Sequence, residues 1–169
     1  MCGSEQCVEL LLNRGCDPNS ANVDGYTPLH AAAQKGQQAC LKTFLQHGAD
    51  AKAKTHEGDT ALHLAAGGGH YSCAELLLGR KEVNIQARNR VGYTPLHSAV
   101  EAGHGDLVTL LLDNNAPPNL SDFSGATPLD IAERNENEKC VELLSDIGGK
   151  FSRRRKGVAK LMRRLFYCL

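Results

Sequence analysis

The hexapeptide GYTPLH occupies residues 25–30 and returns unchanged at residues 92–97. Two variants of it, GDTALH and GATPLD, occupy residues 58–63 and 125–130. The threonines of the four copies stand at positions 27, 60, 94 and 127, so the steps between them are 33, 34 and 33 residues. A nearly constant period of this length is typical of a protein built from stacked, similar units.

Each copy of the hexapeptide carries the signals that begin a helix. Threonine suits the N-cap position, where its hydroxyl can accept a hydrogen bond from a backbone N–H that lacks a partner within the helix. Proline follows in three copies, at the first helical position, where its missing N–H costs nothing. An alanine stands five positions after each threonine, and its small side chain allows neighbouring helices to approach closely. A glycine ends the helix in each of the first three units. The alanines are Ala32, Ala65, Ala99 and Ala132, and the glycines are Gly36, Gly69 and Gly103.

An apolar stripe predicts a second helix in each unit. In the first three units apolar residues stand 13, 14, 17 and 18 positions after the threonine, a spacing that places them on one face of a helix. Gly48, Asn115 and Gly148 stand where the second helices should end, because glycine and asparagine tolerate the left-handed backbone of a C-terminal cap. Polar and turn-forming residues then lead to the next copy, enough for a hairpin-like finger.

Two helices and a finger thus form one unit, and this unit resembles the ankyrin repeat, whose signature is T-P-L-H-x-A at a 33-residue period. The resemblance covers residues 5–149. It implies an all-α solenoid of four full repeats and an N-terminal half repeat, in which the first helices and the finger tips form a concave binding face. The expected units are residues 1–23 (partial), 24–57, 58–90, 91–124 and 125–149.

The second unit departs most from the pattern. It has Ala61 in place of proline and ends its first helix in Gly67, Gly68 and Gly69, so we expect it to be the least stable unit. No lysine followed by serine or threonine comes after these glycines, so they do not read as a phosphate-binding loop. The extra residue of the 34-residue step lies within residues 79–84, in an expected surface turn.

The two ends of the array are also predicted to be atypical. In the last copy Asp130 replaces histidine and Glu136 replaces glycine, and a terminal unit needs a polar outer face to stay soluble. At the other end, residues 7–19 match a second helix with no first helix before it. We favour the interpretation that the chain is a fragment or isoform of a longer array. The alternative is that another segment covers the half repeat.

Seven cysteines and seven histidines raise the question of metal or catalytic chemistry. Cys7, Cys40, Cys73 and Cys140 share one position of the apolar stripe, so we expect all four to be buried as small hydrophobic residues. His70 and Cys73 have the spacing of half a zinc motif, without the second half. The hexapeptide histidine has a structural role in the family that the chain resembles. Since no motif places a base near a nucleophile, we predict a non-catalytic protein without a metal or cofactor.

The resemblance places the finger tips and the ends of the first helices on the concave face, and we predict that this face binds another protein. Aromatic residues contribute disproportionately to interfaces, so Tyr26, Tyr93 and Phe123 are the preferred candidates. The alternative for the tyrosines is that they only cover the base of the finger. The predicted contact residues are Val23, Asp24, Tyr26, Gln34, Lys35, His56, Glu57, Asp59, Arg90, Val91, Tyr93, Glu101, Phe123, Ser124, Glu133 and Arg134.

Charge is divided unevenly along the chain. All 19 acidic residues lie at or before Asp146 together with 11 lysines and arginines, which gives this part a net charge of −8. Residues 150–169 contain eight basic residues and no acidic residue, and apolar residues recur there at helical spacing. We predict a basic amphipathic C-terminal helix. Its main cations are Arg153, Arg154, Arg155, Lys156, Lys160, Arg163 and Arg164.

Four roles for residues 150–169 stay open: docking onto the acidic repeats, binding an anionic membrane, serving as a calmodulin-type target, and nuclear import through the sequence RRRK. Docking is favoured because it would cover an apolar face and pair opposite charges. The acidic repeats argue against nucleic acid as a partner. The sequence has 41% apolar residues, and it contains no membrane-spanning run and no secretory signal. We therefore expect a monomer in the cytoplasm or the nucleus.

Overall fold

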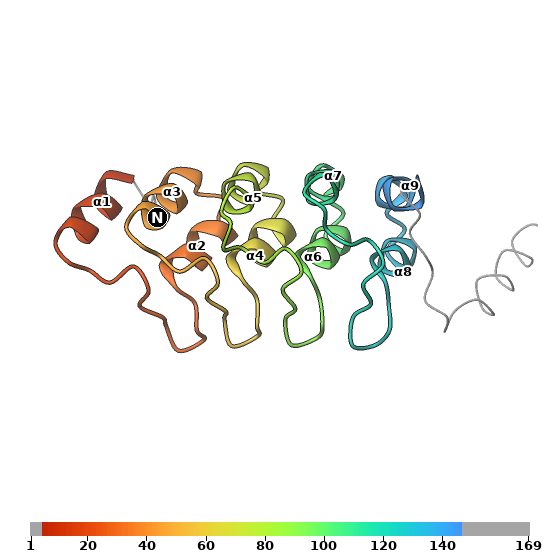
Figure 1. Cartoon of the computed structure of the whole chain (residues 1–169), viewed down its shortest axis with the longest axis horizontal. Helices are drawn as coiled ribbons and strands as arrows, with labels where there is room; N and C mark the ends of the chain where they lie inside the picture. The colour runs from red at the N-terminus through yellow and green to blue at the C-terminus, as the bar shows by residue number, and fades with distance from the viewer. Residues whose placement is uncertain (1–4, 147–169) are drawn as a thin grey trace, which may run out of the picture.

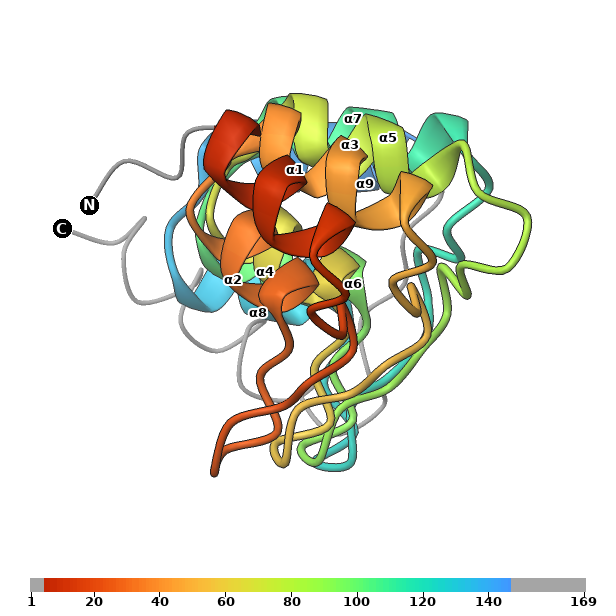
Figure 2. The same cartoon turned by 90° about the vertical axis from the view of Figure 1, so that its left-hand side faces the viewer.

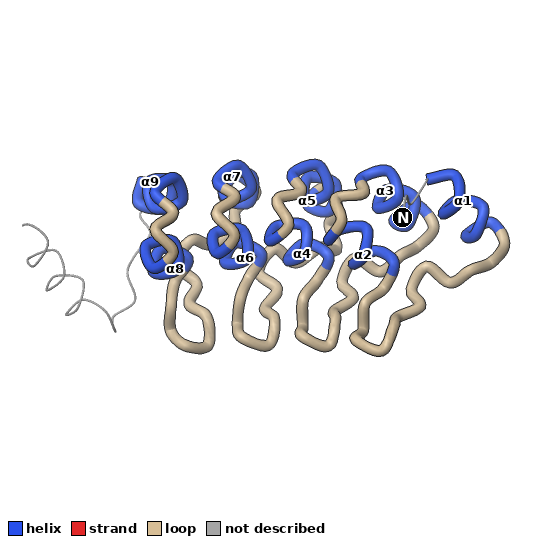
Figure 3. Tube along the Cα trace, turned by 180° about the vertical axis from the view of Figure 1, so that it is seen from behind, coloured by secondary structure: helices blue, strands red, loops and turns tan. Residues whose placement is uncertain are grey.

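The computed structural model describes residues 5–146, in which the regular structure consists of nine α-helices and no strand. The helices lie in two layers, with α1, α3, α5, α7 and α9 in one and α2, α4, α6 and α8 in the other (Figures 1 and 3). The all-α repeat fold is therefore confirmed for the described residues. The helices are α1 (Glu5–Asn13), α2 (Pro28–Gln34), α3 (Gln38–Gln46), α4 (Ala61–Gly67), α5 (Tyr71–Leu78), α6 (Pro95–Glu101), α7 (Gly105–Asp113), α8 (Pro128–Arg134) and α9 (Glu138–Asp146).

The core lies between the two layers and is shared by neighbouring units. Helix α4 contacts α2 and α6 on either side and α5 in the other layer, and α6 has equivalent neighbours. The leucine of each hexapeptide is at most 2% exposed, and burial of one such side chain contributes about 1.5–3 kcal/mol. These leucines are Leu29, Leu62, Leu96 and Leu129. Because a helix pair buries its apolar side only against its neighbours, the units stabilise one another.

The predicted helix starts are confirmed. Pro28, Pro95 and Pro128 are the first residues of α2, α6 and α8, and each follows a threonine with an extended backbone. Helix α4 begins after a threonine in the same conformation. The loops between the layers project together on one side of the molecule as four fingers (Figures 1 and 2).

The histidine of the hexapeptide joins the start of its own helix to the next unit. The Nδ1 atom of His30 accepts a hydrogen bond from the backbone N–H of Thr27 (3.2 Å) and lies 2.9 Å from the threonine hydroxyl. Its Nε2–H donates to the carbonyl oxygen of Ala53 (3.0 Å). His63 has equivalent contacts and donates to the carbonyl oxygen of Tyr93 (2.9 Å). The structural role that the resemblance implies is thus visible in both units.

The third and fourth units depart from this pattern. The Nδ1 atom of His97 lies 3.1 Å from the backbone N and 2.8 Å from the hydroxyl of Thr94, but its buried Nε2 atom has no hydrogen-bond partner among residues 5–146. In the last unit Asp130 accepts hydrogen bonds from the N–H and the hydroxyl of Thr127, both at 2.8 Å. A carboxylate can therefore replace the imidazole at the helix start.

The expectation that four stripe cysteines are buried is correct for three and wrong for Cys7. Cys40, Cys73 and Cys140 are at most 2% exposed, and burial raises the pKa of each thiol. Cys7 is exposed because α1 packs against α3 without a first helix of its own among the described residues. The same arrangement leaves Leu10 58% exposed.

Two helix ends show how the backbone accommodates sequence changes. Asn115 has a φ of 65°, the left-handed conformation that its position predicts, and Glu136 has a φ of 57° where other units carry glycine.

Helix α5 has eight residues, one fewer than α3 or α7, and ends at Leu78. The longer connection over residues 79–84 bulges beyond the other loops (Figure 2). None of the helices in residues 5–146 has the length and apolar character needed to cross a membrane.

The glycines at the end of α4 lead to a prediction about local stability. Gly67 is the last residue of α4 and Gly68 is its C-cap, and each glycine in a helix costs about 1 kcal/mol relative to alanine. In hydrogen exchange followed by mass spectrometry, amides of residues 61–69 are expected to exchange faster than those of residues 95–103. Gly67→Ala should reduce the difference. Equal protection of the two segments in the unmodified protein would contradict the prediction.

Candidate protein-binding groove

A groove with a volume of about 1010 Å³ lies between the finger tips and the exposed sides of α4, α6 and α8. Half of the sixteen predicted contact residues line it. They are Gln34, Asp59, Val91, Tyr93, Glu101, Phe123, Ser124 and Arg134. We call this feature the concave groove.

The other predicted contact residues lie outside the concave groove. The first finger contributes nothing to the lining, and its tip residue Val23 is 88% exposed. The groove is therefore formed mainly by the second, third and fourth units. The residues outside it are Val23, Asp24, Tyr26, Lys35, His56, Glu57, Arg90 and Glu133.

Sequence reasoning missed the other half of the lining. Part of it follows from helix geometry, because positions four, seven and eight after the threonine fall on one face of a first helix. Counting these positions in α4 and α6 would have found the small residues of the floor. The missed residues are His63, Leu64, Gly67, Gly68, Asn89, Ser98, Ala102 and Asp122.

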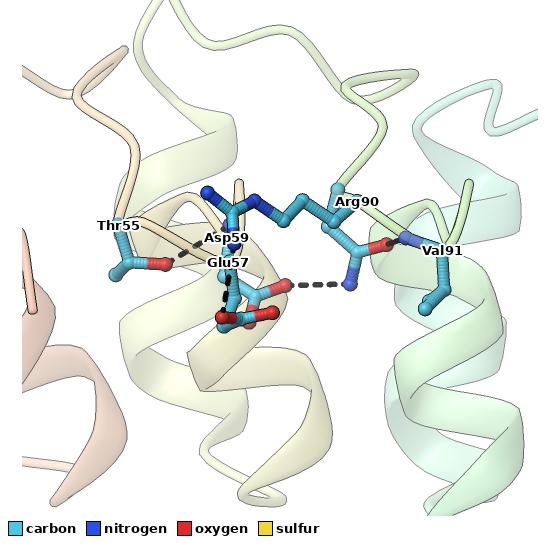
Figure 4. Close-up of polar contacts among 6 residues, drawn as sticks. Thr55, Glu57, Asp59, Arg90 and Val91 are labelled. Carbon is cyan, nitrogen blue, oxygen red and sulfur yellow. Dashed lines mark hydrogen bonds and ion pairs between the residues drawn. The ribbon is translucent and has the colours of Figure 1, made fainter.

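The finger tips form one wall of the groove, and backbone hydrogen bonds join adjacent tips, partly through residues outside the groove lining. The N–H of Arg90 donates to the carbonyl oxygen of Glu57 (2.8 Å), and the N–H of Phe123 donates to that of Val91 (3.1 Å). Figure 4 shows the second and third fingers, where Asn89 Nδ2 donates to Asp59 Oδ1 (2.8 Å). These bonds hold the fingers in register.

Figure 4 also shows an ion pair between Arg90 and Glu57 on the same wall. Their charged atoms are 3.4 Å apart, and the side chains are 65% and 72% exposed. Such an exposed pair contributes at most about 1 kcal/mol, because water and salt screen it. The wall therefore depends on the backbone bonds more than on this pair.

A polar residue five positions before each threonine braces the finger internally. Asn89 Oδ1 accepts hydrogen bonds from the N–H groups of Val91 (3.2 Å) and Tyr93 (2.9 Å). Asp122 Oδ1 does the same for Ser124 and Ala126, both at 2.8 Å. Burial acts to raise the pKa of Asp122, but the hydroxyl of Ser124, which donates to Oδ1 (2.7 Å), and the two N–H groups outweigh it, so the pKa is lowered overall. The recurrence of Asn22, Thr55, Asn89 and Asp122 was a sequence signal for this bracing.

The tyrosines pack against the hexapeptide histidines. The ring of Tyr93 stacks on that of His97 with centroids 5.4 Å apart, and Tyr26 meets His30 edge-on at 5.9 Å. The hydroxyl of Tyr93 donates to Glu101 Oε1 (3.2 Å), and burial is the main cause that raises its pKa. These contacts fit the interpretation that tyrosines cover the base of the finger, although Tyr93 also lines the groove.

Phe123 and Val91 present apolar side chains at the rim of the groove. They are 69% and 56% exposed. The guanidinium carbon of Arg88 lies 5.8 Å from the centroid of the Phe123 ring, a cation–π contact that helps to hold the ring in place. Exposed apolar side chains beside a groove are typical of an interaction site.

His70 and Cys73, which have the spacing of half a zinc motif, are both committed to structural contacts. The Nε2–H of His70 donates to the carbonyl oxygen of Gln34 (2.9 Å), whereas Cys73 lies in the core. No cluster of three or more histidine, cysteine or acidic residues within residues 5–146 has the arrangement of a metal site. The predicted tail cations lie outside the described residues. They are Arg153, Arg154, Arg155, Lys156, Lys160, Arg163 and Arg164.

Comparison with known proteins agrees with the repeat architecture. A family model described as "Ankyrin repeats (3 copies)" matches residues 1–89, and a second one, "Ankyrin repeats (many copies)", matches residues 80–132. A search of curated proteins finds no match. The 33-residue period, the paired helices, the threonine caps and the projecting fingers all agree with these matches, and the chain belongs to the ankyrin-repeat family.

Proposed function

We propose that this protein is a non-catalytic interaction module, a scaffold or adaptor, that holds a segment of a partner protein in the concave groove. Ankyrin repeats are generally protein–protein interaction modules. The observation that supports the groove as the site is the exposure of Phe123 and Val91 at its rim, beside a floor of first-helix side chains. A partner would bury these apolar side chains, which are otherwise in contact with water.

The charge of the groove favours a basic partner segment. Asp59, Glu101 and Asp122 line it with a single cation, Arg134, among the lining residues. The described part of the chain has a net charge of −8, so its field attracts positively charged segments and raises their association rate. Binding should therefore weaken as the salt concentration rises.

The bracing of the fingers favours tight binding by a preformed surface. The rim residues Val91 and Phe123 are fixed by the backbone bond between their fingers, and the polar residue within each finger holds its turn. A surface that is already ordered loses little conformational entropy when a partner binds.

A second role, recruitment to an anionic membrane, a calmodulin-like partner or the nucleus by residues 150–169, rests on the eight basic residues of that segment. Docking of the segment on its own repeats is the third arrangement, and cytoplasm or nucleus is the proposed location. Deletion of residues 150–169 separates these roles: loss of liposome binding or nuclear accumulation with unchanged groove binding would assign recruitment to the tail.

Phe123→Ala is expected to weaken groove binding by about tenfold or more, because a partner in the groove would bury the Phe123 ring and a large side chain buried in an interface can contribute about 2 kcal/mol or more. Peptides selected from a random display library on the full-length protein serve as probes, with affinities measured by fluorescence anisotropy. Val23→Ala is the matched control, because Val23 occupies the equivalent tip position outside the groove. An equal effect of the two substitutions would contradict the proposed site.

A further inference from the structure

The floor of the concave groove has a gap in its row of side chains. The seventh residue after the threonine lies in the groove in all four units. Three units carry long polar side chains at this position, namely Gln34, Glu101 and Arg134, whereas the second unit carries Gly67. The gap therefore lies between Gln34 on one side and Glu101 on the other.

The residues around the gap are small or apolar. Gly68 and Ala102 follow Gly67 and Glu101 in the lining, and Ser98 is the nearest side chain of α6. Leu64 lies one helical turn before Gly67 and Gly68, so it forms the edge of the same face. Together these residues form a recess in the floor, which we call the Gly67 recess.

The fold gives no steric reason for glycine at position 67. A Cβ atom added there would meet only the Cβ of Ser98, at an ordinary 3.8 Å, and the backbone lies outside the left-handed region. By contrast, a Cβ at Gly68 would lie 2.6 Å from the ring of His70, and Gly69 has a φ of +76°. Since glycine weakens a helix relative to alanine, Gly67 lowers stability without a packing requirement that explains it.

We propose that Gly67 keeps open a subsite that receives one large apolar side chain from a basic partner segment; this inference rests on the proposed function of the groove. Leu64, Ala102 and the ring of Tyr93 offer apolar surface to such a side chain. An uncompensated polar group would lose its water there, which disfavours polar occupants. The nearby carboxylates of Asp59 and Glu101 suit lysine or arginine on either side of the apolar residue.

Gly67→Gln tests the subsite by filling it with the side chain that the first unit carries at this position. The probe is a peptide selected from the display library on unmodified full-length protein, and its affinity is expected to fall at least about tenfold. The thermal midpoint should stay equal or rise, because glutamine favours a helix more than glycine does. Gly79→Gln is the matched control: like Gly67, Gly79 lies at the end of a helix with an ordinary backbone, but it lies outside the groove. It should leave affinity unchanged.

A double-mutant cycle makes the test independent of effects on folding. The large apolar residue of the selected peptide is replaced by alanine, and this peptide is measured against the unmodified protein and Gly67→Gln. The peptide change should cost about tenfold with the unmodified protein and less than about threefold with the variant. Equal losses with both proteins would overturn the subsite. If Phe123→Ala still weakens binding in that case, the proposed function stands; if it also has no effect, both proposals fail.

Discussion

Acidification from pH 7 to pH 5 is expected to destabilise the protein by at least about 2 kcal/mol. Burial lowers the pKa of His97 from 6.5 to about 4, so the folded protein keeps this ring neutral where the unfolded chain becomes protonated. The stability gained from the neutral His97 ring is fully present above about pH 6.5. As the pH falls, about 2 kcal/mol of this stability is lost by pH 5 and about 3 kcal/mol by pH 4. Burial is also the main cause that lowers the pKa of His30 and His63, so their contributions fall in the same direction.

His97→Asn identifies the main source of this pH dependence. Asparagine can keep an acceptor near the N–H of Thr94 but does not titrate. Urea unfolding followed by circular dichroism should show that the loss between pH 7 and pH 5 is smaller by about 2 kcal/mol in this variant. If the variant keeps the full pH dependence, the assignment to His97 is wrong.

The equivalent substitutions in the first two units provide the comparison. His30→Asn and His63→Asn each remove a donor that bonds a carbonyl oxygen of the next finger, whereas His97 Nε2 has no such partner within residues 5–146. At pH 7 they should therefore cost about 1 kcal/mol more than His97→Asn. Similar costs at all three positions would mean that the bonds to the fingers contribute little.

The fold could be predicted from the sequence because its signals are local and repeated. The threonine cap, the proline after it and the apolar stripe each act within one or two helical turns, and four copies fix the period. The position of Asn115 likewise predicted its left-handed backbone, since a helix end needs one and asparagine tolerates it.

Features that depend on neighbouring units could not be read from the period alone. Cys7 occupies a stripe position but is exposed, because burial requires a first helix that α1 lacks among the described residues. Gly67 looked like a weak helix end, and only the packing of α4 beside α6 shows that it faces the groove. Likewise, the hexapeptide does not reveal that His97 Nε2 lacks, among residues 5–146, the bond that His30 and His63 make, because their partners belong to the next finger.

Gly92→Ala is expected to destabilise the protein by about 3 kcal/mol or more, whereas Gly125→Ala should cost only about 1–2 kcal/mol. The two glycines hold the same place in their fingers, with φ of +86° and +87°, so an alanine meets the same left-handed strain in both. A Cβ at Gly92 would also lie 2.6 Å from the backbone nitrogen of Phe123, while one at Gly125 has no described atom within 4 Å. The difference between the two variants in urea unfolding therefore measures the contact between adjacent fingers.

The same pair of variants links the stability of the fingers to binding. Relief of the clash at Gly92 must move Phe123 and strain the bond from its N–H to the carbonyl oxygen of Val91 (3.1 Å). Peptide affinity should therefore fall about tenfold or more in Gly92→Ala and stay within about twofold in Gly125→Ala, at a temperature where both variants are folded. If the two variants are equally stable and bind equally well, adjacent fingers do not hold one another in place. The groove wall would then have to form when the partner binds, and binding would include the entropy cost of ordering it.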